Sequence, residues 1–520
     1  MENRSKEEEA GLAPAQWSTR FLILSLAGIF FLTLLPFRFN FHAVLPGNRS
    51  PFLLAGWGKY ASQFDELLNI LLFIPFGFAF TDRFLRRRGS KTAVLMGAFA
   101  AGALLSYSIE FLQIYVPSRD SGWGDIFTNT AGSVLGCLLY EVVGAPILRF
   151  LSSGESALAK LLTWPRFGAA IPLYFAFWLA VSAPLQQETR LSNWDPAALL
   201  LIGNDASGEY GAAWEGEVYS LQLWDRPLDR AAVEQLVAAK EPRLDERGLL
   251  AWYDLSAPRA AYDQMNRLPR LGLVSKPDLG RWRQGAAHPT PFFDGNRWLA
   301  SSVPVANLVR ALQKTNQFTV RVVCRADRIG EMNAAIVSVS GRSGIADIEI
   351  AQDDANLDFV FRSPIAAGRY SLPWVIPGVF AAHRVRDVVF SYDGSSAFAY
   401  VDGQAAAPYR LGPGTALARY FRHIKTGEMD GYAYIYYALI FFLGGIFTGI
   451  AWRNLAPGNV AGQTTLVATS LAPAFLLEAI LVSVSGRPVS GATVLLSLAL
   501  LLAGSMWINA DRRPGLNPRP

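Results

Sequence analysis

Long apolar runs lie at both ends of the chain, on either side of a polar middle segment. Five runs occupy the first third and three close the chain, at residues 17–37, 64–80, 92–116, 126–150, 167–185, 432–452, 464–484 and 489–510. A helix rises 1.5 Å per residue and the hydrocarbon core is about 30 Å thick, so such runs predict about eight membrane-spanning helices. Only residues 485–488 separate the last two runs, so a re-entrant hairpin is the alternative there.

Between residues 186 and 431, apolar and polar side chains alternate in short runs, for example at residues 318–323, 335–339 and 387–392. The dipeptides Asp294–Gly295, Asp393–Gly394 and Asp402–Gly403 divide these runs. Alternation with a period of two is typical of strands, and Asp-Gly favours tight hairpin turns. We therefore predict an all-β antiparallel sandwich, with residues 230–240 as its clearest helix.

Composition agrees with a membrane protein. Hydrophobic residues make up 51% of the 520 residues and charged residues 17%, whereas soluble proteins carry about 25% charge. The net charge of +5 is small for this length and fits basic loops at a membrane better than a nucleic-acid surface. Cys137 and Cys324 lie in very different segments, so neither a disulfide framework nor a metal site is indicated.

Lysine and arginine predict the orientation of the helices. With the N-terminus inside, the inner loops and tails hold fifteen of these residues and the short outer loops hold five. Cytoplasmic loops are enriched in both residues, so we expect both termini in the cytoplasm and residues 186–431 outside it. The glutamate-rich start and the lack of a small-residue cleavage site predict a cytosolic tail rather than a signal peptide.

Polar side chains gather around the second, third and fourth apolar runs. They are Asp65, Asn69, Glu110, Gln113, Arg119, Asp125 and Asn129. Spacings of three or four residues place the helical pairs on shared helix faces. The direction of each run puts the whole set in the outer leaflet, with Glu478 of the seventh run at a similar depth.

A carboxylate costs about 2.5–3.5 kcal/mol at the bilayer centre on insertion scales, so Glu110 needs a partner, and Arg119 is the obvious one. Gly132 and Gly136 have the small-xxx-small spacing that lets another helix approach closely. Two interpretations stay open: an interhelical clamp without a ligand, or a ligand-binding or catalytic site.

This pattern resembles the VanZ-like family over roughly residues 34–140. The family signature has an acidic residue before an apolar helix, then Glu-x-x-Gln, a Pro-x-Arg loop, Asp, Asn and Gly-x-x-x-Gly. Here these are Asp65, Glu110, Gln113, Pro117, Arg119, Asp125, Asn129, Gly132 and Gly136. Asp65 is followed by Glu-Leu-Leu-Asn where many relatives have a lysine and a histidine, a departure that weakens an inherited proton-transfer role. The resemblance implies a multi-pass protein of the bacterial inner membrane, in a family named after a protein linked to glycopeptide antibiotic resistance.

The middle segment resembles concanavalin A-like (laminin G-like) jelly rolls. Residues 248–254 look like that family's opening strand, and residues 293–295, 318–320, 388–394 and 399–403 follow in its usual order. Its closing segments, an Ile-Gly-Asn strand and a Trp-Asp-Arg-Pro-Leu turn, lie ahead of the opening strand, at residues 201–204 and 223–228. We therefore expect a circularly permuted jelly roll whose first strands complete the sheet edge.

Together, the apolar runs and the two resemblances predict domains at residues 17–150 (VanZ-like, four helices), 151–185 (linker and fifth helix), 186–431 (β-sandwich) and 432–510 (three helices), with cytoplasmic tails at 1–16 and 511–520. Jelly rolls bind glycans, calcium or proteins, or act as spacers. Trp282, Trp298 and Trp374 are candidates for stacking on sugar rings, with burial in the core as the alternative. No cofactor is predicted; calcium at Asp353 and Asp354 is the alternative to a solvated loop.

The leading hypothesis is a cell-envelope protein that binds a surface glycan, glycolipid or lipid-linked precursor. Arg119 would contact an anionic group, while Glu110 and Asp125 would position that group or neighbouring hydroxyls. The expected partners are membrane lipid and a glycan, glycolipid or envelope protein, and no nucleic acid. One alternative is an intramembrane enzyme that uses Glu110 or Asp125 as general acid or base. Another is a scaffold that recruits a protein.

Overall fold

The computed structural model describes residues 2–34, 39, 63–85, 90–116, 122–206, 214–239, 241–242, 246–256, 262–275, 292–341, 346–366, 374–406, 408–420 and 429–510. The chain forms two compact units. The first, here called the helical unit, comprises Met1–Ala176, Tyr437–Pro473 and Leu495–Pro520. The second, the β unit, comprises Phe177–Tyr436 and Ala474–Val494.

Among the described residues, eight helices are long and apolar enough to cross a membrane. They are α1 (Glu2–Leu34), α2 (Gln63–Phe80) with its π-helical extension η2 (Thr81–Leu85), α3 (Lys91–Gln113), α4 (Trp123–Leu161), α5 (Phe167–Gln187), the continuous segment of α9 (Met429–Tyr437), η5 (Ala438–Phe442) and α10 (Leu443–Arg453), α11 (Val460–Ser485), and α12 (Gly491–Asn509). The prediction of eight hydrophobic helices is confirmed. Because α11 and α12 have 26 and 19 residues, both are long enough to span.

One helix is much longer than its apolar run. The sequence predicts an end near residue 150, but α4 has 39 residues in all and ends at Leu161. Residues 155–161 read Glu-Ser-Ala-Leu-Ala-Lys-Leu, mostly good helix formers, so the helix continues after the apolar run has ended. In α4, hydropathy therefore locates the apolar part of the helix, whereas helix propensity determines the residue at which the helix ends.

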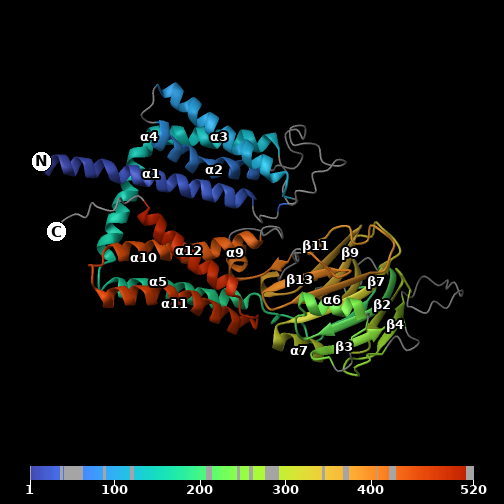
Figure 1. Cartoon of the computed structure of the whole chain (residues 1–520). Coiled ribbons are helices and arrows are strands. Elements are labelled where there is room, and N and C mark those ends of the chain that lie inside the picture. Colours follow the sequence, from blue (N-terminus) through green and yellow to red (C-terminus); the bar gives the residue numbers. More distant parts are fainter. Residues whose placement is uncertain are drawn as a thin grey trace. The chain divides into compact units, whose positions relative to one another are not determined.

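Helices α2, α3 and α4 lie side by side in the helical unit (Figure 1). Glycines permit this approach. A Cβ at Gly132 would overlap the carbonyl oxygen of Ile70 on α2, and a Cβ at Gly136 would overlap that of Ile74. The contact is reciprocal, because a Cβ at Gly77 of α2 would overlap the carbonyl of Ser133 on α4. Backbone therefore packs directly on backbone along this seam, as small residues allow in membrane helices.

The β unit contains two antiparallel sheets in the described part of the chain. Their strands are β1 (Leu199–Ile202), β2 (Glu215–Trp224), β3 (Leu249–Asp254), β4 (Leu271–Ser275), β5 (Phe292–Asp294), β6 (Arg297–Ser301), β7 (Phe318–Ala326), β8 (Ala334–Ser340), β9 (Ala346–Asp353), β10 (Asn356–Phe361), β11 (Trp374–Ile376), β12 (Arg386–Tyr392), β13 (Ser396–Val401), β14 (Gln404–Ala405) and β15 (Tyr409–Arg410). One sheet has the order β11-β10-β9-β8-β1-β6-β4. The other has β14-β13-β12-β7-β2-β3, with β15 paired to β13 and β5 to β2.

The two sheets pack face to face, as the sequence predicted for a sandwich. The rings of Phe359 on β10 and Phe390 on β12 stack with centroids 3.9 Å apart, and they belong to different sheets. Trp374 on β11 packs edge-on against both rings. Inward-facing aromatic side chains from both sheets thus form the core.

The expected position of the first strands was wrong. We expected them to complete the sheet edge, but β1 pairs with β8 and β6, and β2 pairs with β7 and β3. Both are interior strands. The uninterrupted apolar run Leu199–Ile202 fits this position, because a strand covered on both faces does not alternate.

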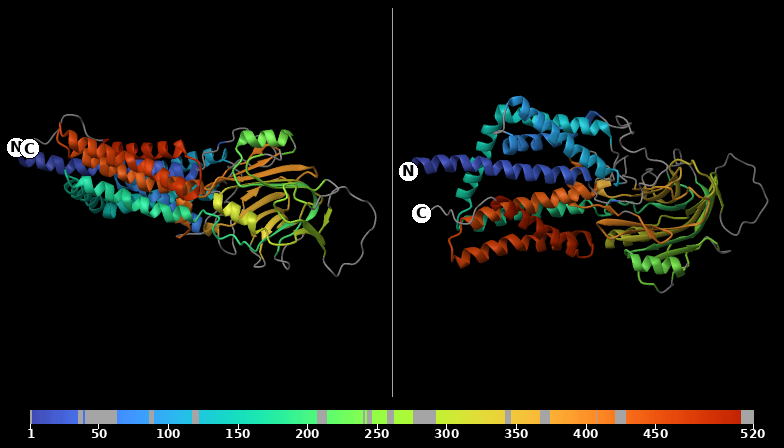
Figure 2. Two further views of the ribbon diagram at one scale, coloured as in Figure 1. Left: turned by 90° about the horizontal axis from the view of Figure 1, so that it is seen from below. Right: turned by 45° about the horizontal axis from the view of Figure 1, so that its top comes forward.

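Helix α6 (Arg230–Ala239) forms where the sequence predicted it, and its Val233 and Leu236 pack on Trp224, Leu249 and Val389 of the eight-stranded sheet. Figure 2 shows α6 on the outer side of the sandwich. Two further helices, α7 (Ala306–Thr315) and α8 (Pro413–Arg419), were not predicted. The buried residues of α7, Leu308, Val309 and Leu312, have the i, i+1, i+4 spacing of one helix face, and this spacing is the sequence signal for the helix.

The turn between α11 and α12 is held by the sandwich within the β unit. Asn316 Nδ2 donates to the carbonyl of Ser485 at 2.6 Å, and Gln317 Nε2 donates to that of Gly486 at 2.6 Å. Arg190 also donates to the carbonyl of Val484 at 2.6 Å. These side chains satisfy the carbonyls that a helix leaves unpaired at its C-terminus, so they cap α11.

Candidate functional site

A buried polar stripe runs along one face of α3. Ser106, Glu110 and Gln113 are spaced at i, i+4 and i+7, so they share one face of the helix. All three are buried, and Glu110 is only 1% exposed. Ser106 was not among the residues singled out from the sequence, although its spacing from Glu110 was the available signal. The stripe is the centre of the candidate site.

The side chain of Glu110, on α3, contacts the N-terminus of α4. Its Oε2 accepts a hydrogen bond from the backbone N–H of Gly122 at 2.9 Å, and Gly122 is the N-cap residue of α4. The first N–H groups of a helix have no intrahelical acceptor and carry a partial positive charge, so a carboxylate is favourable there. This contact supplies part of the compensation that a buried carboxylate needs.

Amide and hydroxyl groups connect the three helices. Asn69 of α2 donates to Asp125 Oδ1 of α4 at 2.8 Å. Asn129 Nδ2, one turn further along α4, donates to Ser106 Oγ of α3 at 2.9 Å. The i, i+4 spacing of Asp125 and Asn129 brings both onto the α4 face that meets the polar stripe.

Gln113 extends the site to the first helix. Its Nε2 donates to the carbonyl oxygen of Thr33 on α1 at 2.9 Å. Two buried acceptors, Gln113 Oε1 and Asn129 Oδ1, have no hydrogen-bond partner among the described residues. Each unpaired buried acceptor lowers the stability of the folded protein by about 1–3 kcal/mol. These two oxygens are therefore the atoms of the site that most need a hydrogen-bond donor.

Some sequence-predicted residues lie elsewhere or outside the described residues. Arg119 falls outside them, and Asp65 is in the first turn of α2 with its side chain also outside them. Glu478 of α11 belongs to the β unit, where it pairs with Arg487 and accepts from Ser490 N–H at 2.6 Å. Its partners thus come from the turn between α11 and α12.

A second buried charge cluster in the helical unit was missed. Arg20 of α1 is 1% exposed and donates to Glu155 Oε2 at 2.9 Å and to the carbonyl of Ile508 at 2.6 Å. Arg453 donates to Glu155 Oε1 at 2.6 Å. In the sequence, Arg20 and Arg453 were counted only as basic residues of the inner side. Glu155 lies beyond the fourth apolar run, so nothing marked it as their partner.

The candidate ligand residues of the β-sandwich have different positions. Trp374 is 7% exposed and its ring stacks on Tyr409, so it is a core residue, as the alternative interpretation had it. Trp298 is partly buried on β6, and Trp282 lies outside the described residues. Asp353 and Asp354 form the turn between β9 and β10, with Asp354 at a φ of 56°. Across the described part of the chain, no group of three or more His, Cys, Asp or Glu is arranged to hold a metal ion.

The family comparison matches the part of the chain that contains the polar stripe and the helices around it. A model of the family described as VanZ/LLP1 matches residues 16–144, which include α2, α3 and the first part of α4. Neither curated proteins nor solved structures gave a match to this chain. The chain is a multi-pass membrane protein in its helical part, and its residues 16–144 form a VanZ-like domain.

Proposed function

We propose that the VanZ-like domain binds the head group of a membrane lipid, glycolipid or lipid-linked saccharide in the polar site of α2, α3 and α4. The observation that carries the proposal is the pair of buried acceptors, Gln113 Oε1 and Asn129 Oδ1, without a partner among the described residues. Polar groups inside membrane helices are costly to keep and are functional candidates for that reason.

The unpaired atoms favour a ligand with hydrogen-bond donors. Amide oxygens accept from hydroxyl, amine or amide groups, so hydroxyl-bearing head groups are the best chemical match. Glu110 and Asp125 are already engaged by Gly122 N–H and Asn69, which favours a positioning role over proton transfer. Arg119 stays a prediction as the contact for an anionic phosphate or carboxylate.

The proposed setting is the bacterial inner membrane, with both termini in the cytoplasm. Eight spans would bring the C-terminal ends of α3, α5 and α11 to the same membrane face, because odd-numbered spans run in one direction. The threefold excess of lysine and arginine on the opposite side supports an extracytoplasmic position for that face. The β-sandwich would then lie outside the cytoplasm.

We further propose that the sandwich is a concanavalin A-like jelly roll that meets an envelope glycan. The order of its motifs along the chain supports this, as does the pairing of β2, which carries part of the early Trp-Asp-Arg-Pro-Leu segment, between β7 and β3.

Lipid retained by the purified protein tests the polar site. Gln113→Leu keeps the side-chain volume and removes the amide, so the variant should retain at least severalfold less of the lipid that co-purifies with the native protein. Mass spectrometry of lipid extracted from equal amounts of detergent-purified protein measures this. Gln463→Leu on α11 is the matched control and should retain the native amount. Equal lipid on the native protein and Gln113→Leu, with normal folding, would count against the proposal.

A further inference from the structure

A pocket of about 460 Å³ lies at one edge of the sandwich, where the edge strands of the two sheets meet. Ile376 of β11 lines it from one sheet, and Val401 and Gln404 of β13 and β14 line it from the other. Pockets of 300–1,000 Å³ are typical of small-molecule sites. The volume fits a compact ligand about the size of one sugar ring.

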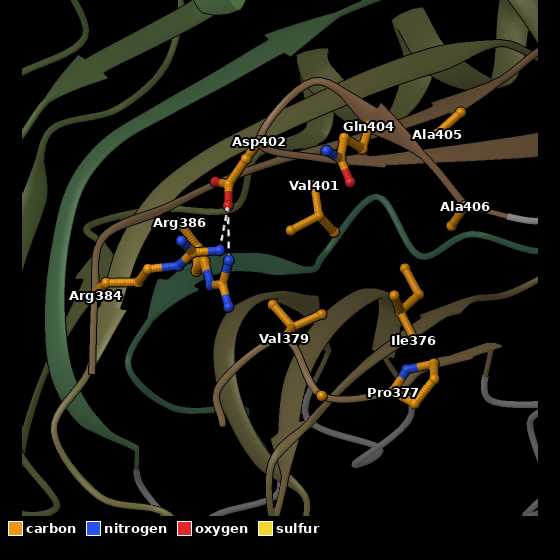
Figure 3. A pocket seen from close by; sticks show the side chains of 11 residues that line it. Ile376, Pro377, Val379, Arg384, Arg386, Val401, Asp402, Gln404, Ala405 and Ala406 are labelled. Carbon is orange, nitrogen blue, oxygen red and sulfur yellow. Dashed lines mark hydrogen bonds and ion pairs between the residues drawn. The ribbon is translucent and has the colours of Figure 1, made fainter. Parts of the chain in front are cut away.

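Charged side chains gather at one end of this pocket, and apolar side chains at the other (Figure 3). Arg386, at the start of β12, donates to Asp402 Oδ2 at 2.7 Å. Arg384 Nη2 lies 3.5 Å from the same oxygen. Two guanidinium groups therefore share one carboxylate, and this end of the pocket carries a net positive charge.

The carboxylate is fixed by the turn that carries it. Asp402 and Gly403 have φ values of 52° and 79°, as expected for the Asp-Gly turn between β13 and β14. Asp402 Oδ1 accepts from the backbone N–H of Asp387 at 3.0 Å, and both arginines contact Oδ2. The protein thus offers one oxygen to two cations.

Each of the two arginines has guanidinium N–H groups that no acceptor among the described residues satisfies. The Arg386 side chain is 9% exposed, and its buried Nε has no hydrogen-bond partner there. Arg384 is 64% exposed, so its guanidinium is open to solvent beside the pocket. A buried guanidinium without full partners is unfavourable, and a planar anion is the partner that its fork geometry matches.

We propose that this pocket binds a compact organic anion through its carboxylate, with Arg384 and Arg386 contacting the carboxylate and Ile376, Val379 and Val401 contacting the body of the ligand. The chemistry fits an acidic sugar or the carboxyl end of a short peptide. With an acidic sugar as the ligand, the proposal rests on and deepens the part of the proposed function that gives the sandwich an envelope glycan; binding of a peptide end instead would contradict that part and leave the pocket assignment standing. Its residues are separate from Gln113 and Asn129, so the failure of either test does not decide the other.

Ligand-observed NMR titration of the full chain in detergent tests the pocket. The probes are glucuronate with glucose as its neutral counterpart, and N-acetylalanine with its methyl ester. We expect at least one carboxylate to bind with millimolar affinity and its neutral counterpart to bind at least tenfold more weakly. A preference for glucuronate identifies an acidic sugar, and one for N-acetylalanine a peptide end. Equal binding of each pair, or no binding, would overturn the proposal.

Three variants assign that binding to the pocket. Arg384→Gln removes an exposed charge and should weaken carboxylate binding about tenfold. Ala405→Trp keeps both arginines and fills the pocket from an exposed position, so it should abolish binding. Arg230→Gln removes another exposed arginine, from α6, and should bind as the native chain does. Native affinity in both pocket variants would contradict the assignment.

Discussion

At the scale of single residues, buried charges in this chain have partners from distant parts of the sequence. Glu155 of α4 accepts from Arg20 of α1 and from Arg453 of α10. A buried charge without its counterion is far less stable than a paired one. Glu155 therefore links three helices whose apolar surfaces alone would leave their register loosely defined.

Replacing Glu155 by Ala should destabilise the helical unit, because two buried guanidinium groups would lose their shared carboxylate. Removing one partner of a buried ion pair typically costs about 3–5 kcal/mol. Thermal unfolding of the detergent-purified protein measures the loss. Glu141→Ala, at an exposed position on the same helix, is the control. The same melting temperature for both variants would show that the cluster does not stabilise the fold.

Glu349 of β9 gives the β-sandwich a pH dependence. Burial, together with the nearby carboxylates of Asp205 and Asp358, raises the pKa of Glu349 to about 7. The folded chain therefore keeps this proton up to about pH 7, whereas the unfolded chain releases it near 4.5. The free energy of unfolding therefore decreases as pH rises from about 4.5 to about 7, because deprotonation is easier in the unfolded chain than in the folded one. Above about pH 7 the full loss of stability is present.

The variant Glu349→Gln removes this penalty. It should be more stable than the native chain at pH 8, by on the order of 1–3 kcal/mol, and nearly equal to it at pH 4.5. Unfolding of the sandwich, followed by its β-sheet circular dichroism at both pH values, checks this. A native-like loss of stability between the two pH values in the variant would be the contrary result.

At the scale of elements, the α2–α4 seam depends on glycine. A methyl group at Gly136 would meet the carbonyl oxygen of Ile74 and would push the helices apart. Gly136→Ala should therefore destabilise the protein by about 1–3 kcal/mol, the usual cost of overpacking. Gly154→Ala on the same helix meets nothing within 4 Å and should stabilise slightly, since alanine favours helix. Thermal melts that rank the two variants the other way would contradict this packing.

The helices and strands were more predictable from the sequence than the contacts between them. Apolar run length gave all eight long helices, and the Asp402–Gly403 dipeptide gave a real turn. The pairing of Arg20 with Glu155 could not be predicted, because residues 135 positions apart meet only after the helices pack. Gly122 as the partner of Glu110 was equally hidden, since a backbone N–H has no sequence signature.

At the scale of the whole molecule, the two compact units divide within helices rather than at loops. The β unit includes the sandwich together with the turn between α11 and α12, which Asn316 and Gln317 hold. Within the β unit, specific hydrogen bonds therefore attach the sandwich to the C-terminal end of α11.

The orientation of the whole molecule can be tested with one introduced cysteine. The native cysteines, Cys137 and Cys324, are both buried, so they give little background. A cysteine at exposed Val303 in the sandwich should react with a membrane-impermeant maleimide in intact spheroplasts. A cysteine at exposed Ala157, near the end of α4, should react only after permeabilisation. The reverse pattern would place the sandwich in the cytoplasm.

The central claim is that the polar site of the VanZ-like domain holds a lipid head group. An electron cryo-microscopy map of the protein in lipid nanodiscs tests it most directly. We predict non-protein density within hydrogen-bond distance, about 2.7–3.2 Å, of Gln113 Oε1 and Asn129 Oδ1. A map in which side chains or backbone N–H groups of this chain satisfy both oxygens, with no further density beside them, would contradict the account.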